Sequence, residues 1–313
     1  MDTLRTPGYV LRRYGLETPQ IIKGASTQMN TPLIDTHQHL WDLAKVEYPW
    51  LIPAYGPLYR TYVAAELEPQ LAEAGVSATV LVQSANSFED TVYMLDQTDV
   101  YPWIIGVVGW MDLLNPEATA KAIERFSKNP TFKGMRHLIH EEPNPHWLLQ
   151  EPIYESLKLL ADAGLTFDVV ATKHEHMECV PIVGEKVPHL KMAIDHLAQP
   201  PFKDGTPGQW GEDMRLAATN PNVYAKISGL GTASGDWEGW TADSIRELVH
   251  WTIDLFGAGR CMLGGDWPVS VLAGGYVKAI AAYKQILSDR PFAEQEQISY
   301  KTAMAFYNLS LPG

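Results

Sequence analysis

The chain has few cysteines, few positive charges and no long apolar run, and each shortage excludes a class of protein. Its 313 residues include two cysteines, Cys179 and Cys261, which cannot form a disulfide framework and therefore fit a reducing compartment. Lys and Arg number 24 against 37 Asp and Glu, and the net charge of −13 argues against nucleic acid or an anionic membrane as a partner. No apolar stretch reaches the roughly 18 residues of a membrane span.

The N-terminal segment also lacks a recognisable targeting signal. Residues 1–30 contain no apolar core like that of a secretory signal peptide, and they show little periodicity. We therefore expect a cytoplasmic protein in which residues 1–30 form an extension and residues 31–313 form one barrel domain. The sequence leaves a homo-oligomer open, with the extension either covering one end of the domain or joining a subunit contact.

What the sequence does have is a regular series of short apolar runs in a globular composition, 46% hydrophobic and 19% charged. Runs rich in β-branched residues predict eight strands, at Leu33–His37, Ala78–Ser84, Trp103–Met111, Phe132–Leu138, Thr166–Ala171, Lys191–Leu197, Val223–Leu230 and Cys261–Trp267.

Segments with helical spacing separate these runs. Among them are Tyr62–Ala74, Pro116–Ser127, a segment from Pro152 to Gly164, Ala242–Phe256, and a last helix that ends near Asn308. Eight strands that alternate with helices predict an α/β fold with a parallel sheet, and eight units favour closure into a (β/α)₈ TIM barrel. An open, doubly wound sheet is the alternative that periodicity leaves open.

Polar side chains end three of the predicted strands. His37 and His39 project to the same side of the first strand, about 6.6 Å apart along the chain, and can converge on one metal ion or one substrate oxygen. His196 ends the sixth strand and Asp266 the eighth. Because barrel enzymes place their sites at the C-terminal ends of the strands, we expect the four side chains to meet there. A turn or cap role for Asp266, and a structural role for His196, are the alternatives.

Five motifs, in this order, resemble the amidohydrolase-2 branch of the amidohydrolase superfamily. They are Asp35–Asp42, Gly134–His137, Asp195–Pro201, Lys226–Leu230 and Gly264–Val269. The likeness is strongest to sugar-acid lactonases of the L-fuconolactonase and L-rhamnonolactonase type and to 2-pyrone-4,6-dicarboxylate lactonase. The resemblance implies a distorted TIM barrel, in which the paired histidines, His196 and Asp266 correspond to the family's residues on strands one, six and eight.

One departure from the wider superfamily concerns the metal. Binuclear members use a carboxylated lysine at the end of strand four, whereas here Lys133 lies three residues, about 10 Å, before Arg136 and should not reach that position. We therefore do not expect two metal ions. One divalent ion, Zn²⁺ or Mn²⁺, held by the three histidines and Asp266 is one expectation, and metal-independent catalysis is the other. His174 is interpreted as a solvated helix start rather than a further ligand.

Opening a lactone requires an activated water, a polarised carbonyl and protonation of the leaving alkoxide. We assign Asp266 as the general base, which later returns the proton to the leaving oxygen. His37, His39 and His196 would polarise the carbonyl, either as hydrogen-bond donors or through a bound ion. The predicted function is hydrolysis of a small sugar-acid (aldono) lactone.

Six further residues are candidates for substrate binding. They are Arg136, Trp41, Gln83, Lys226, Tyr48 and Trp50. The Arg136 guanidinium offers a planar fork of donors for a carboxylate or ring oxygen. The three aromatic residues lie in the long loop after strand one, where they suit a sugar ring or form a small satellite core. Because cations are few on the predicted rim, a neutral or singly charged aldonolactone fits better than a dicarboxylate.

The sequence leaves two other functions to consider. A metal-dependent decarboxylase of an aromatic or unsaturated carboxylic acid shares the His-x-His start and the strand-eight Asp in the same branch. A barrel that binds a sugar or a protein without turnover is disfavoured, because all four candidate catalytic residues are present.

Overall fold

The structure is a computed structural model that describes residues 31–202 and 207–311. The extension expected over residues 1–30 lies outside these ranges. Among the helices of the described ranges, none is both long enough and apolar enough to cross a bilayer.

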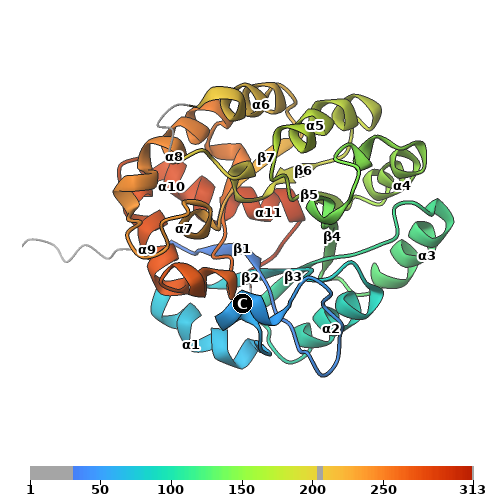
Figure 1. The fold of residues 1–313 in the computed structure, drawn as a ribbon, viewed down its shortest axis with the longest axis horizontal. Coiled ribbons are helices and arrows are strands. Elements are labelled where there is room, and N and C mark those ends of the chain that lie inside the picture. The colour runs from blue at the N-terminus through green and yellow to red at the C-terminus, as the bar shows by residue number, and fades with distance from the viewer. Residues whose placement is uncertain (1–30, 203–206, 312–313) are drawn as a thin grey trace, which may run out of the picture. The chain divides into compact units, whose positions relative to one another are not determined.

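Eight parallel strands form one sheet, in which each strand pairs with the next along the chain. They are β1 (Ile34–Gln38), β2 (Ala78–Val82), β3 (Ile104–Gly109), β4 (Phe132–His137), β5 (Thr166–Val169), β6 (Met192–Ile194), β7 (Val223–Ile227) and β8 (Cys261–Leu263). The first and last strands also meet, because a parallel bridge joins Gln38 to Trp267. This bridge closes the ring in Figure 1, so the predicted TIM barrel is confirmed and the open sheet is excluded.

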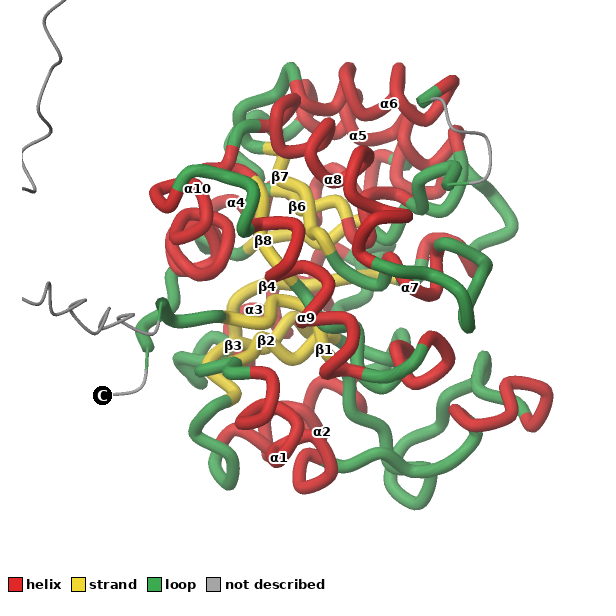
Figure 2. The backbone as a smooth tube through the Cα atoms, turned by 90° about the vertical axis from the view of Figure 1, so that its left-hand side faces the viewer, coloured by secondary structure: helices red, strands yellow, loops and turns green. Residues whose placement is uncertain are grey.

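Helices surround the strands, as Figure 2 shows in red around yellow. They are α1 (Ala64–Ala74), α2 (Phe88–Thr98), α3 (Pro116–Phe126), α4 (Glu151–Asp162), α5 (His174–Lys186), α6 (Gly208–Ala218), α7 (Leu230–Ala233), α8 (Ala242–Phe256), α9 (Tyr276–Leu287), α10 (Phe292–Glu296) and α11 (Thr302–Tyr307). The predicted start of α3 is confirmed, since the Asn115 side chain accepts from the Ala118 N–H at 3.1 Å and Pro116 follows as the first helical residue.

Three strands end at least three residues earlier than the sequence predicts. β6 ends at Ile194, β7 at Ile227 and β8 at Leu263, each several residues before the predicted end. The reason is the backbone, which turns into the left-handed region at His196 (φ 52°) after β6, Gly229 (φ 61°) after β7 and Asp266 (φ 53°) after β8, where a strand cannot continue. The polar residues expected at the strand ends therefore stand on short irregular segments just beyond them.

Helix α11 closes the barrel at the end where the strands begin. Its apolar side chains and Tyr307 belong to one buried cluster with inward-facing strand residues, namely Ile34, Val80, Val82, Val108, Ala193 and Met262. Figure 1 shows the helix within the ring of strands. Lys133 Nζ donates to the Asn308 carbonyl at 2.9 Å, and Lys191 Nζ donates to the Ala305 carbonyl at 3.0 Å. Lys133 therefore points to the closed end of the barrel, away from the opposite rim.

Candidate active site

A β-bulge in β1 turns His37 into the barrel. Asp35 pairs with Thr79 but Gln38 pairs with Leu81, so β1 has one residue more than β2 over this stretch. The extra residue shifts the alternation of side chains, and His37 faces the interior although Ile34, three residues earlier, does so too. His39 follows on the same side, with its Nε2 3.0 Å from Nε2 of His37.

His196 and Asp266 reach the same place through left-handed backbone. Four consecutive non-glycine residues, 196–199, have φ between 51° and 55°, and Asp266 has φ 53°. Each costs about 1–2 kcal/mol relative to ordinary backbone, so the surrounding structure must hold it in place. Such residues cluster at functional sites, where they aim a side chain that regular structure would misdirect.

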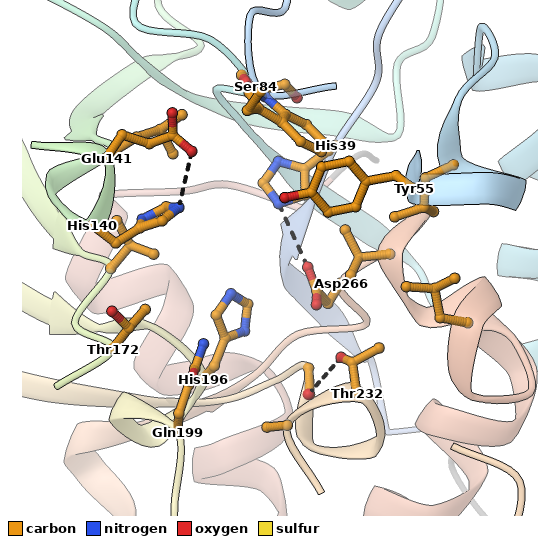
Figure 3. Close-up of a pocket in the computed structure, with 18 of the residues that line it drawn as sticks. His39, Tyr55, Ser84, His140, Glu141, Thr172, His196, Gln199, Thr232 and Asp266 are labelled. Atoms are coloured by element: carbon orange, nitrogen blue, oxygen red, sulfur yellow. Dashed lines mark hydrogen bonds and ion pairs between the residues drawn. The ribbon is translucent and has the colours of Figure 1, made fainter. Parts of the chain in front are cut away.

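The four side chains form one cluster at the C-terminal ends of the strands. Asp266 Oδ1 lies 3.5 Å from His39 Nε2 and 3.9 Å from His37 Nε2. The rings of His37 and His196 have centroids 4.4 Å apart. Figure 3 shows His39, His196 and Asp266 directed into a common cavity. The structure thus brings together the residues that the sequence assigns to three separate strand ends.

Three members of the cluster, His39, His196 and Asp266, line a cavity of about 490 Å³, whereas His37 is fully buried and does not line it. Trp41, Trp50 and Tyr55, from the loop after β1, supply an aromatic wall. His140 and Glu141, just after β4, supply the wall opposite Asp266 (Figure 3). The sequence does not single out His140, although it follows β4 at the same rim as the other site residues.

Beneath the cavity, two cations and two carboxylates compensate each other. Arg136 Nη1 lies 3.1 Å from Asp195 Oδ2, and Lys226 Nζ lies 3.1 Å from Asp195 Oδ1. Lys226 also pairs with Asp168, and all four side chains are buried. Among the Lys and Arg side chains that the structure describes, none forms an ion pair with Asp266. Asp266 is thus the carboxylate of the site without a cationic partner.

Burial dominates the electrostatics. It raises the pKa of Asp266 to about 6, although His196 and Arg136 oppose the shift. It lowers the pKa of His39 to about 3 and also lowers the pKa values of His37 and His196. At neutral pH the site therefore holds three neutral imidazoles and one ionised, relatively basic carboxylate.

The donor set fits a divalent metal ion. His39 Nδ1 lies 2.8 Å from the Val82 carbonyl, so this nitrogen carries the ring proton and Nε2 keeps a lone pair directed at His37. Ligand atoms of His37, His196 and Asp266 lie within 4.8 Å of one another. Imidazole nitrogens with one carboxylate oxygen are ligands that Zn²⁺ and similar ions accept.

The six candidates for substrate binding occupy three kinds of position. Arg136, Trp41 and Trp50 line the cavity, but Arg136 Nη2 donates to the Gln83 carbonyl at 2.5 Å and Nη1 is engaged by Asp195. Gln83 and Lys226 lie beneath the cavity and are fully buried.

Tyr48 is buried away from the cavity lining, and its hydroxyl donates to Asp90 at 3.2 Å. Its position is that of the satellite core. His174 is the first residue of α5, as expected, with Nδ1 2.9 Å from Asp213.

Comparisons of sequence and of structure with known proteins indicate the same family. The amidohydrolase family pattern matches residues 34–309. An L-fucono-1,5-lactonase of Burkholderia ambifaria is 35% identical over 244 residues, which cover 78% of this chain and 82% of the relative. An L-fucono-1,5-lactonase of Burkholderia multivorans is 27% identical, covering 89% and 97%. A crystal structure of a B. multivorans amidohydrolase, with HEPES bound, superposes with a TM-score of 0.82 at 26% identity, covering 89% of this chain and 100% of that one. A second crystal form of that protein, with bound zinc, gives 0.81. On its sequence and its fold, the chain belongs to the amidohydrolase family.

Proposed function

We propose that this protein hydrolyses a neutral sugar-acid lactone, an activity of carbohydrate metabolism. The observation that carries the proposal is the position of Asp266 at the cavity. Its carboxylate lies beside neutral imidazoles and forms no ion pair with any Lys or Arg side chain of the described residues. Both Burkholderia relatives, named as L-fucono-1,5-lactonases, support the substrate class.

The cavity lining favours a substrate without a carboxylate. Arg136 is the single Lys or Arg among the described residues that line the cavity, and Asp195 neutralises it. Glu141 and Asp266 add negative charge to the same walls. Away from the ion site, a carboxylate on the substrate would meet these negative charges, and no unpaired Lys or Arg side chain of the described lining would hold it.

In the proposed mechanism Asp266 accepts a proton from the attacking water. The water oxygen adds to the lactone carbonyl carbon, the ring C–O bond breaks, and the proton returns from Asp266 to the leaving oxygen. The product is the open hydroxy acid. A pKa near 6 suits both halves of this proton transfer, because the carboxylate is ionised at pH 7 yet basic enough to take the proton.

The imidazoles divide their roles according to their hydrogen bonds. Because His39 donates its ring proton from Nδ1 to the Val82 carbonyl, its Nε2 can accept a hydrogen bond or ligate a metal ion but cannot donate to the substrate. Ser228 Oγ lies 3.0 Å from His196 Nδ1, and its hydroxyl can satisfy that nitrogen while Nε2 carries the proton. His196 is therefore the imidazole suited to donate to the developing oxyanion. When bound by the three histidines and Asp266, a Zn²⁺ or Mn²⁺ ion would supply Lewis acidity.

A panel of lactones tests the substrate class. We expect hydrolysis of at least one neutral sugar-acid lactone, such as an L-fucono- or L-rhamnonolactone, with kcat/KM above about 10⁴ M⁻¹ s⁻¹. A sugar lactone that carries a carboxylate should react at least about tenfold more slowly, because like charges meet in the cavity. Acid release can be followed with a pH indicator, with a buffer blank for spontaneous opening. Preference for the charged lactone, or no turnover of any neutral one, would contradict the proposal.

Removal of metal tests the donor set. We expect about one divalent ion per chain in the purified protein, and at least a tenfold loss of activity after treatment with a chelator, restored by Zn²⁺ or Mn²⁺. Metal content should be measured on the same samples by elemental analysis. Full lactonase activity in protein shown to be ion-free would leave Asp266 and the imidazoles to act alone, and would also eliminate the metal-dependent decarboxylase.

A further inference from the structure

A chain of buried polar contacts joins helix α11 to the candidate active site. The Tyr307 hydroxyl lies 2.9 Å from both carboxylate oxygens of Asp168 and donates to them. Asp168 pairs with Lys226. Lys226 Nζ in turn lies 3.3 Å from Nδ1 of His37 and 3.1 Å from Oδ1 of Asp195. This series of polar contacts runs through the inside of the barrel, from the closed end to the cluster of histidines.

Every residue in this series of polar contacts is buried. The side chains of Asp168, Lys226, Asp195 and His37 are 0% exposed, and Tyr307 is 1% exposed. Burial of an ion pair is costly, and a well-packed apolar core at these positions is often as stable or more so. Fold stability alone is therefore a weak reason for the ion pair of Asp168 and Lys226. The contact of Lys226 with the ring of His37 offers a stronger one.

The contacts around His37 show how this series of polar contacts can fix the orientation of its ring. Nδ1 of the ring faces the Asp195 carboxylate at 3.2 Å and the Lys226 ammonium at 3.3 Å, and Nε2 faces His39 at 3.0 Å. Asp195 is also held by Arg136 from the other side. Arg136 Nη1 also lies 3.3 Å from Nε2 of the ring. The ring orientation thus depends on the positions of Lys226, Asp195 and Arg136, and Asp168 with Tyr307 fixes Lys226 from below.

We propose that Tyr307 is a positioning residue of the active site, which acts through Asp168 and Lys226 to fix the ring of His37. The proposal deepens the lactonase assignment and, for its kinetic consequences, rests on it. Tyr307 does not touch substrate, since it lies at the opposite end of the barrel. Its hydroxyl matters because it is the donor that holds the Asp168 carboxylate toward Lys226.

The main test is the Tyr307→Phe variant, which removes the hydroxyl and keeps the ring. Loss of such an outer hydrogen bond typically costs about 10–100-fold in activity, and we expect at least tenfold in kcat, with KM within about twofold of wild type. Phe306→Leu is the matched control, because Phe306 lies in the same buried cluster of α11 and carries no polar atom. The control should lower Tm and leave kcat unchanged.

A double-mutant cycle separates positioning from general loosening. Asp168→Asn should lower kcat in the same direction, and adding Tyr307→Phe to it should cause no further loss, because the hydroxyl acts through that carboxylate. Nitrogen NMR of the His37 ring in chelator-treated protein is the second readout. The resonances should shift in Tyr307→Phe and stay in place in Phe306→Leu.

The outcomes distinguish the two proposals. If Tyr307→Phe keeps kcat within twofold, if the two substitutions are additive, or if Phe306→Leu moves kcat and the His37 resonances equally, then Tyr307 is structural only. If wild type opens no lactone, the lactonase assignment fails, and the NMR comparison still decides whether Tyr307 controls His37.

Discussion

Asp266→Asn should lower kcat/KM for the lactone by about 10²–10⁴-fold, the usual contribution of a general base. The amide has nearly the shape of the carboxylate but cannot accept the proton of the attacking water. The neighbouring imidazoles cannot replace the base, because His39 has a pKa near 3 and the pKa values of His37 and His196 are also lowered. Steady-state kinetics on the lactone that wild type prefers will measure the loss.

The pH profile of wild type provides an independent check of the same residue. A carboxylate acts as a base only when ionised, and burial raises the pKa of Asp266 to about 6. In chelator-treated wild type, where Asp266 ligates no ion, the residual kcat/KM should therefore rise with pH up to about 6 and level off above it. Asp266→Asn should remove this acidic limb.

Asp90→Asn is the matched control. Burial raises the pKa of Asp90 to about 6 as well, but its carboxylate caps Ser84 and Ala85 outside the histidine cluster. This variant should keep the acidic limb. Activity of Asp266→Asn within tenfold of wild type would contradict the assigned role.

Gly229→Ala should disable the enzyme through one methyl group. A Cβ at this position would stand 2.6 Å from His196 Nδ1 and 2.7 Å from Asp266 Oδ2, closer than real contacts allow. The side chains of His196 and Asp266 would have to move away from the new methyl group, and a displacement of about 1 Å in a catalytic group can cost 10²-fold in rate. The backbone, at φ 61°, adds about 1–3 kcal/mol of strain for any residue with a side chain.

Gly164→Ala separates the contact from the strain. Gly164 also has a left-handed backbone, φ 71°, but a Cβ there would meet nothing within 4 Å. It should lose stability in thermal unfolding, by about 1–2 kcal/mol, and keep its activity. Comparison of kcat and Tm for the two variants isolates the effect of the methyl group on His196 and Asp266. Equal kcat values for the two would show that Gly229 is not needed for the site.

Much of the site could be predicted because it follows from strand alternation. The side chains of His37 and His39 share a face as any i, i+2 pair on a strand does, and parallel strands of a barrel bring all their C-terminal ends to one rim. That reasoning needs only local pattern and strand count. It places His196 and Asp266 beside the pair without any knowledge of their backbone.

The remaining features of the site depend on tertiary contacts that a local sequence pattern cannot predict. The bulge between Asp35 and Gln38 is set by pairing with β2, and the left-handed residues 196–199 are held by tertiary packing against their preferences. The contact of Tyr307 with Asp168 spans 139 residues of sequence. The sequence presents Lys226 as a substrate-binding candidate because its carboxylate partners, Asp168 and Asp195, lie elsewhere in the chain. Likewise, the sequence presents Tyr48 as a candidate for sugar binding because its partner, Asp90, lies on helix α2, outside the loop that holds Tyr48.

The seam between β1 and β8 has a consequence for how the enzyme comes into being. The Asp266 N–H donates to the His37 carbonyl at 2.7 Å, and the His39 N–H donates to the Trp267 carbonyl at 2.6 Å. The main chain of the candidate site residues thus joins the first strand to the segment after the last one. During synthesis, the histidine pair would therefore leave the ribosome well before its partners on β8, and the site could assemble only after Asp266 and Trp267 had emerged and paired with β1.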